Sequence, residues 1–220
     1  ATFLLDVPMR DLRAAGKALG GSLNDAYLAA LGGGLRRYHE ALDSSVGEVP
    51  VGMPISLRTK DDGDGGNRFA GARIGLPVAE RDPSARMARV REQVLRARDE
   101  PALDLTGATA PLMSRVPTPH LTRATGSFTK ALDLQASNFR GLDRPAFMAG
   151  AEVLEVYPLG PVPGCAIMAT LISHSGTCCI GVAVDTSAVT DVALLRTCLR
   201  EGIAEILSDT GTAPSDATGL

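Results

Sequence analysis

Residues suited to acid–base catalysis are scarce in this 220-residue sequence, which contains three histidines, His39, His120 and His174. Asp43 follows His39 by four residues, and a histidine oriented by a carboxylate is typical of a general base. This pair falls at the end of an expected amphipathic helix, however, so we favour a solvated helix end over a catalytic pair. His120 and His174 have no visible acidic partner in the sequence, and we expect a structural role for each.

The cysteines give no sign of a metal site or a disulfide framework. Their positions, which lack any CxxC spacing, are Cys165, Cys178, Cys179 and Cys198. A reducing, cytoplasmic environment is therefore expected. Strand geometry would point the adjacent Cys178 and Cys179 to opposite faces, one to the core and one to the surface. The sequence also lacks the GxSxG, GxxxxGK and HExxH motifs and a GxGxxG after a strand, so most familiar enzyme classes are unsupported.

Composition points to one soluble globular domain. The chain has 45% hydrophobic residues, 22 basic and 25 acidic residues and a formal net charge of −3, which argues against generic binding to nucleic acid backbones. Residues 156–184 contain no charged side chain. Prolines at 158, 161 and 163 and a polar turn at 173–176 interrupt this stretch, which predicts two buried strands and no transmembrane helix.

Hydrophobic periodicity predicts an α+β fold in which helices and a mixed sheet form a two-layer sandwich. Strands are expected at 2–7, 49–57, 70–78, 132–139, 152–157, 165–173 and 177–184, and helices at 9–20, 22–42, 82–98 and 189–207. Prolines in the strand at 49–57 favour an edge or bulged position. The domain is expected to span residues 1–207, and the polar tail at 208–220 is expected to be disordered.

Local patterns refine two of these helices. Ser22 and Asp25 have the spacing of a capping box, which is enough to start the helix at 22–42. Three consecutive glycines, Gly32–Gly34, weaken the same helix and predict close approach of another backbone or a ligand, or a local break. In the helix at 82–98, periodicity places Arg86 largely on the solvent face.

Five short segments together carry a family resemblance. They are Ser22–Ala29, Pro54–Arg58, Gly66–Phe69, Ser137–Asn138 and Glu155–Pro161. In this order they resemble the C-terminal half of the bacterial wax ester synthase/diacylglycerol acyltransferase (WS/DGAT) family, over about residues 2–207. The chain departs from the family where Phe139-Arg140-Gly141 replaces the usual Val-Pro-Gly.

The resemblance implies a chloramphenicol-acetyltransferase-like fold of two similar halves with a channel between them. It implies transfer of an acyl group from acyl-CoA, a substrate and not a cofactor, to a fatty alcohol or diacylglycerol, as in wax ester and triacylglycerol synthesis. In the family the base is the second His of HHxxxDG in an N-terminal half, a motif absent from this sequence. The chain starts inside an expected strand and without Met, so we expect a fragment or processed product, inactive alone. Its expected partners are that catalytic half and its lipid substrates, in the cytoplasm or peripherally at a membrane or lipid droplet.

The resemblance also assigns roles to polar residues near the expected element ends. Asn24 and Asp25 would brace the channel at the interface between the halves, or would only form the first turn of a capped helix. Arg58 would attract the phosphates of CoA, or would be a solvated strand end. Asn67 would bind substrate, or would only serve its turn.

Ser137 and Asn138 are the best candidates for donors near the thioester oxyanion, where one donor contributes roughly 3 kcal/mol. The alternative is an Asx turn that ends their strand. Two other functions stay open. One is a self-contained acetyltransferase that oligomerises and uses His39 as its base, and the other is a non-catalytic lipid- or acyl-CoA-binding domain.

Overall fold

The computed structural model describes residues 1–56, 69–99, 131–142, 144–162 and 164–208. Within these ranges, six strands form one sheet in the order β1-β8-β7-β4-β2-β3. They are β1 (Thr2–Pro8), β2 (Val49–Ser56), β3 (Phe69–Leu76), β4 (Leu134–Arg140), β7 (Ile167–His174) and β8 (Thr177–Val184). The helices are α1 (Met9–Ala18), α2 (Leu23–Ala41), α3 (Pro83–Arg98) and α6 (Val192–Ser208). None of the described helices is long and apolar enough to cross a membrane.

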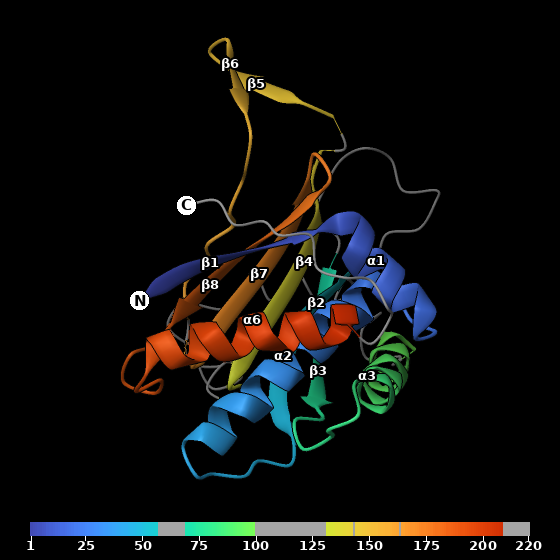
Figure 1. Ribbon diagram of the computed structural model, residues 1–220, viewed down its shortest axis with the longest axis vertical. Coiled ribbons are helices and arrows are strands. Elements are labelled where there is room, and N and C mark those ends of the chain that lie inside the picture. Colours follow the sequence, from blue (N-terminus) through green and yellow to red (C-terminus); the bar gives the residue numbers. More distant parts are fainter. Residues whose placement is uncertain (57–68, 100–130, 143, 163, 209–220) are drawn as a thin grey trace, which may run out of the picture.

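The sheet is mixed, as predicted. Pairing is antiparallel for β1–β8, β8–β7 and β2–β3, and parallel for β7–β4 and β4–β2. The helices gather over one face of this sheet (Figure 1). The α+β two-layer prediction is therefore confirmed, and the uncharged stretch at 156–184 supplies β7 and β8.

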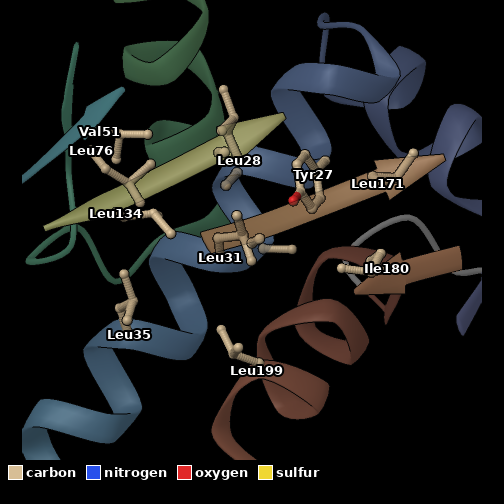
Figure 2. Packing of buried hydrophobic residues seen from close by; sticks show 14 of the residues in the cluster. Tyr27, Leu28, Leu31, Leu35, Val51, Leu76, Leu134, Leu171, Ile180 and Leu199 are labelled. Carbon is tan, nitrogen blue, oxygen red and sulfur yellow. The ribbon is translucent and has the colours of Figure 1, made fainter. Parts of the chain in front are cut away.

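Helix α2 is the centre of the core. Its residues Tyr27, Leu28, Leu31 and Leu35 are buried and lie among apolar side chains of the sheet and of α6 (Figure 2). The predicted capping box is present, because the Ser22 hydroxyl accepts from the Asp25 amide while the Asp25 side chain accepts from the Ser22 amide. The sequence thus defines both the start and the buried face of this helix.

Two of the three glycines of α2, Gly33 and Gly34, let helix α6 approach closely, whereas Gly32 faces Arg86 and Leu76. A Cβ atom on Gly34 would lie 2.8 Å from the Cα of Leu199, and one on Gly202 would lie 2.4 Å from the Ala30 carbonyl oxygen. Only glycine avoids these overlaps. The predicted approach of another backbone is confirmed, and the helix continues without a break.

The apolar periodicity of α3 gives a wrong prediction for the exposure of Arg86. Predicted to face solvent, its side chain is 0% exposed. Its Nε donates to the Ala29 carbonyl oxygen at 2.9 Å, its Nη1 donates to that of Glu80 at 2.8 Å, and its Nη2 pairs with Glu205. A guanidinium can be buried when its donors are matched in this way, which a count of apolar spacing does not detect.

Two strand predictions are also corrected. The strand with prolines, β2, is internal, but it pairs with β4 at only two described positions, Val51 with Leu134 and Gly52 with Gln135. The strand expected at 152–157 ends at Val153. Residues 154–161, here called the crossing segment, then run across β8 instead.

The crossing segment covers the sheet face opposite the helices. A Cβ atom on Gly181 of β8 would lie 2.1 Å from the Pro158 carbonyl oxygen, and the Tyr157 hydroxyl donates to Asp6 of β1 at 2.6 Å. Cys179 lies under this segment and Cys178 lies in the core on the helix side, so both cysteines are buried. The two cysteines do occupy opposite faces, but the prediction that one is exposed is wrong.

A second, two-stranded sheet was not predicted. It consists of β5 (Ala146–Met148) and β6 (Ala151–Val153), which pair only with each other. Ala149 and Gly150 between them both have positive φ, as a tight hairpin turn requires. This β5–β6 hairpin projects away from the body of the molecule (Figure 1).

Candidate functional site

Asn24 and Asn138, separated by 114 residues in the sequence, meet at one end of the molecule. Asn24 lies in the first turn of α2, and Asn138 lies near the end of β4. The Asn138 Nδ2 donates to the Asn24 Oδ1 at 3.4 Å, in an exposed position. Each amide keeps further hydrogen-bonding groups for another molecule, so this pair is the core of the candidate site.

Asp25 supports Asn24 from behind. Its Oδ2 accepts from the Ser22 amide at 2.8 Å and from the Ser22 hydroxyl at 2.9 Å, and it pairs with Arg91 Nη1 of α3 at 3.2 Å. The carboxylate is buried. These contacts support the structural interpretation of Asp25, and they add Arg91, which sequence reasoning missed because nothing in the spacing links α3 to the start of α2.

Ser137 and Asn138 lie on opposite faces of β4, since successive side chains of a strand alternate. Asn138 reaches the helix side, where it contacts Asn24. Ser137 is buried on the other side, and its direct neighbour in the ladder is Thr170 of β7. The two predicted donors are thus separated. The alternative of an Asx turn that ends the strand is wrong, because β4 continues to Arg140.

Thr170 is a second residue that sequence reasoning missed. It is buried, and its Oγ1 has no hydrogen-bond partner in the described part of the chain. A buried hydroxyl without a partner is destabilising. Its position beside Ser137 therefore places two buried hydroxyls next to each other on the face covered by the crossing segment.

Three predicted residues lie outside the described ranges. They are Arg58, Asn67 and His120.

His39 lies far from the asparagine pair. It is fifteen residues after Asn24 on the same helix, which corresponds to about 22 Å at the helical rise. Burial lowers the pKa of its imidazole, an effect that the charge of Asp133 partly offsets. No side-chain hydrogen bond joins His39 to Asp43 within the described structure, and the adjacent cavity of about 180 Å³ is smaller than typical ligand pockets.

His174 is buried, and its Nε2 lies 2.9 Å from the Val153 carbonyl oxygen. The ring therefore ties the end of β7 to the base of the β5–β6 hairpin, which agrees with the predicted structural role.

A larger cavity of about 590 Å³ lies between β3 and α3. Arginines line it, but Arg89 pairs with Glu48 at 3.3 Å and Arg96 pairs with Glu92. Two of its three arginines are thus neutralised by acidic side chains of the same cavity, which weakens it as an anion site, and Arg73 is the third.

The cysteines are not poised for nucleophilic chemistry. All four are free and buried, and burial raises the pKa of each thiol, that of Cys178 to about 11. Among the described residues no group of three or more His, Cys, Asp or Glu side chains is arranged to hold a metal ion.

The strand order and the helices on one face of the mixed sheet are those of a chloramphenicol-acetyltransferase-like half. Solved structures agree on this fold. Wax ester synthase/diacylglycerol acyltransferase from Marinobacter aquaeolei VT8 aligns with a TM-score of 0.70 at 18% identity, over 96% of this chain and 49% of that one. The epimerization domain from the third module of tyrocidine synthetase B aligns with a TM-score of 0.59 at 14% identity, over 96% and 48%.

Sequence comparison then identifies the family. The model of the WS/DGAT C-terminal domain matches residues 65–207, so the chain belongs to this family. It is 44% identical to the provisionally named diacylglycerol O-acyltransferase Rv2484c of Mycobacterium tuberculosis H37Rv, over 96% of this chain and 43% of that protein. Rv3480c of the same strain, provisionally named likewise, is 32% identical over 77% of this chain and 36% of its own length. The chain thus spans less than half the length of these relatives.

Proposed function

We propose that this chain is the C-terminal half of an acyl-CoA-dependent O-acyltransferase that esterifies diacylglycerol or a fatty alcohol. It supplies a wall of the substrate channel and contacts for CoA, and the N-terminal half supplies the general base. Wax ester and triacylglycerol synthesis are the corresponding pathways. The protein works in the cytoplasm, with its lipid substrates reached at a membrane or lipid droplet surface.

Membership of the WS/DGAT C-terminal domain family is the observation that carries this proposal. The two Mycobacterium tuberculosis relatives named above both carry the provisional name diacylglycerol O-acyltransferase. The geometry is in agreement, because the described histidines have no contact with the asparagine pair. His174 contacts the Val153 carbonyl oxygen at the base of the hairpin, and His39 lies at the end of α2 opposite to Asn24.

The chain's own residues act by binding and orientation. The amides of Asn24 and Asn138 offer donors and acceptors at the exposed end of the domain, and Asp25 with Arg91 holds the helix turn that presents Asn24. Arg58 and Asn67 contact CoA or its acyl group. Ser137, buried on the opposite face of β4, supports the strand that presents Asn138.

The two alternative functions receive less support. An oligomeric acetyltransferase based on His39 would need an orienting hydrogen bond and room for a thioester. Among the described residues no side chain hydrogen-bonds to the ring, although the charge of Asp133 acts on it, and the adjacent cavity is only about 180 Å³. A non-catalytic lipid- or acyl-CoA-binding domain would use the same surface as the proposed enzyme half. The binding domain and the proposed enzyme half differ in one expected result: with a binding domain, the chimera described next would show no turnover.

A chimera tests the proposal. The aligned region of Rv2484c is replaced by residues 1–220, and acyl transfer from palmitoyl-CoA to dioleoylglycerol or hexadecanol is measured. The chimera should turn over, whereas the 220-residue chain alone should not. Asn138→Ala should lower the rate by about tenfold or more, as loss of a donor at a reacting group does, and Thr197→Ala on the exposed side of α6 is the control. Normal turnover by the isolated chain would contradict the proposal, as would a folded chimera without activity.

A further inference from the structure

Strand β1 leaves one edge of the main sheet open. It lies at the end of the strand order, with β8 on one side and no described strand on the other (Figure 1). The Ala1 amine donates to the Val184 carbonyl oxygen at 2.9 Å, and the Val184 amide donates to the Ala1 carbonyl oxygen at 2.8 Å. Because backbone groups alternate in direction along an antiparallel strand, Thr2, Leu4 and Asp6 point theirs away from β8. This edge therefore offers donors and acceptors to another strand.

The opposite edge of the sheet, on β3, is protected against such pairing. The outward amide of Gly75 donates to the Gln93 side chain of α3 at 2.7 Å, and Arg73 adds an exposed charge. Proteins use covering side chains, cations and prolines to keep sheet edges from pairing. Strand β1 contains no Lys or Arg, and its one proline, Pro8, stands at its end. The β1 edge is thus a template for strand addition.

Apolar side chains border the β1 edge on the face that the crossing segment covers. Leu4 is 41% exposed and Leu159 is 53% exposed. The two lie close together, because Leu4 pairs with Gly181 in the ladder and a Cβ atom on Gly181 would lie 2.9 Å from the Leu159 Cδ2. Strand addition would bury these side chains, so apolar contact would accompany the backbone hydrogen bonds.

The residue pattern of β1 fits a second copy of the same strand. Antiparallel pairing about a two-fold axis at Leu4 sets Leu4 against Leu4 of the other copy, and Thr2 against Asp6. Apolar residues then meet apolar residues, and the two Asp6 carboxylates stay apart, whereas like charges directly opposite each other would be destabilising. We propose that the open edge of β1 is a homodimer interface, through which the main sheets of two copies join. None of these residues belongs to the asparagine pair, so the interface does not depend on the proposed function.

Sedimentation equilibrium of the 220-residue chain and of the chimera defined above tests the interface. Both should form a reversible dimer. Thr2→Asp, which sets an extra carboxylate opposite Asp6 in both symmetric pairs, should raise the dissociation constant about tenfold or more, and Thr2→Lys should lower it about tenfold. Leu4→Lys should abolish the dimer. The matched control, Leu95→Lys, changes a side chain that is 44% exposed elsewhere on the surface and should leave the dimer unchanged.

Amide hydrogen exchange followed by NMR gives a reading at single residues. The Leu4 and Asp6 amides have no described acceptor within one chain, so their exchange should slow about tenfold or more as the protein concentration rises. The amides of Phe3 and Leu5 face β8 in the ladder and should respond much less. This alternation along β1 is the signature of pairing through the open edge.

Several outcomes would overturn the interface. A monomer at every concentration would do so, as would a dimer that both Leu4→Lys and Thr2→Asp leave intact. A weaker dimer in Thr2→Lys would contradict the pairing of Thr2 with Asp6. A dimer of the isolated chain but not of the folded chimera would show that the N-terminal half occupies the edge. An active but monomeric chimera would refute the interface and leave the proposed function supported, whereas a dimeric chimera without turnover would do the reverse.

Discussion

The buried guanidinium of Arg86 gives the sharpest stability prediction. Replacing Arg86 by Met keeps most of the side-chain volume but removes the donor to the Glu80 carbonyl oxygen and a second donor to the Ala29 carbonyl oxygen, which lies inside α2 and keeps its helical hydrogen bond. Glu205 loses one cation but keeps Arg36 Nη2 at 3.2 Å and Arg37 Nη2 at 2.8 Å. The carboxylate therefore stays compensated, and the cost comes mainly from the Glu80 carbonyl, with smaller parts from the lost second bond at Ala29 and from the weakened ion-pair cluster.

The magnitude follows from these losses. Removing one partner of a buried ion pair costs about 3–5 kcal/mol when the other charge is left unpaired, and each unsatisfied buried acceptor costs roughly 1–3 kcal/mol. Because Glu205 keeps two arginines, Arg86→Met should cost about 3 kcal/mol, near the lower end. Arg89→Met on the same helix, which removes a half-exposed pair with Glu48, should cost at most about 1 kcal/mol.

Urea unfolding of the isolated chain measures both variants. The midpoint should fall strongly for Arg86→Met and little for Arg89→Met, with unchanged slopes. If Arg86→Met does not fold, Arg86→Lys, which keeps the charge but has a single nitrogen that cannot reach all three acceptors, should fold with an intermediate midpoint. Equal, small losses for Arg86→Met and Arg89→Met would refute the reasoning, because the buried network would then contribute no more than a surface pair.

Three further predictions concern other groups. Thr170→Val should raise the free energy of unfolding by about 1 kcal/mol by removing an unsatisfied hydroxyl, and a lower melting temperature would contradict this. Burial alone would raise the pKa of Glu205, but Arg37 and Arg86 hold it below its ordinary value. The stability that ionised Glu205 gives the fold is fully present above the ordinary carboxyl pKa and should be lost as the pH falls through the lowered pKa of Glu205. Urea midpoints measured against pH should therefore fall less in Glu205→Gln than in the unchanged chain. Cys178, with its raised pKa, should react with Ellman's reagent only on unfolding, so fast reaction of the native chain would be inconsistent.

Much of the fold could be predicted from the sequence because its elements repeat a simple pattern. The apolar spacing of α2 and the alternation in β2 and β3 indicate which side of each element is buried, and the Ser22–Asp25 box defines a helix start. The Arg86 error has a physical cause. Its burial depends on a carbonyl group of α2 and a carboxylate of α6, which become neighbours only after the chain has folded.

The candidate site was predicted in part. Asn24 and Asn138 belong to separate predicted segments, and they meet only because the start of α2 lies beside the end of β4 in the folded chain. Thr170 gave no signal, because a single threonine in an apolar strand is ordinary and its importance arises from its neighbour Ser137. The β5–β6 hairpin was missed because three-residue strands are too short to show alternation.

The brief pairing between β2 and β4 gives the sheet a mechanical seam. Within the described residues, two ladder positions join the β1-β8-β7-β4 block to the β2-β3 ribbon, against seven between β4 and β7. Backbone hydrogen bonds are what resist the separation of neighbouring strands, so a spreading force would part the sheet here first. The unpaired part of this boundary lies toward the end of β4 that carries Asn138. A large ligand that has to separate two strands would therefore break the fewest backbone hydrogen bonds between β2 and β4.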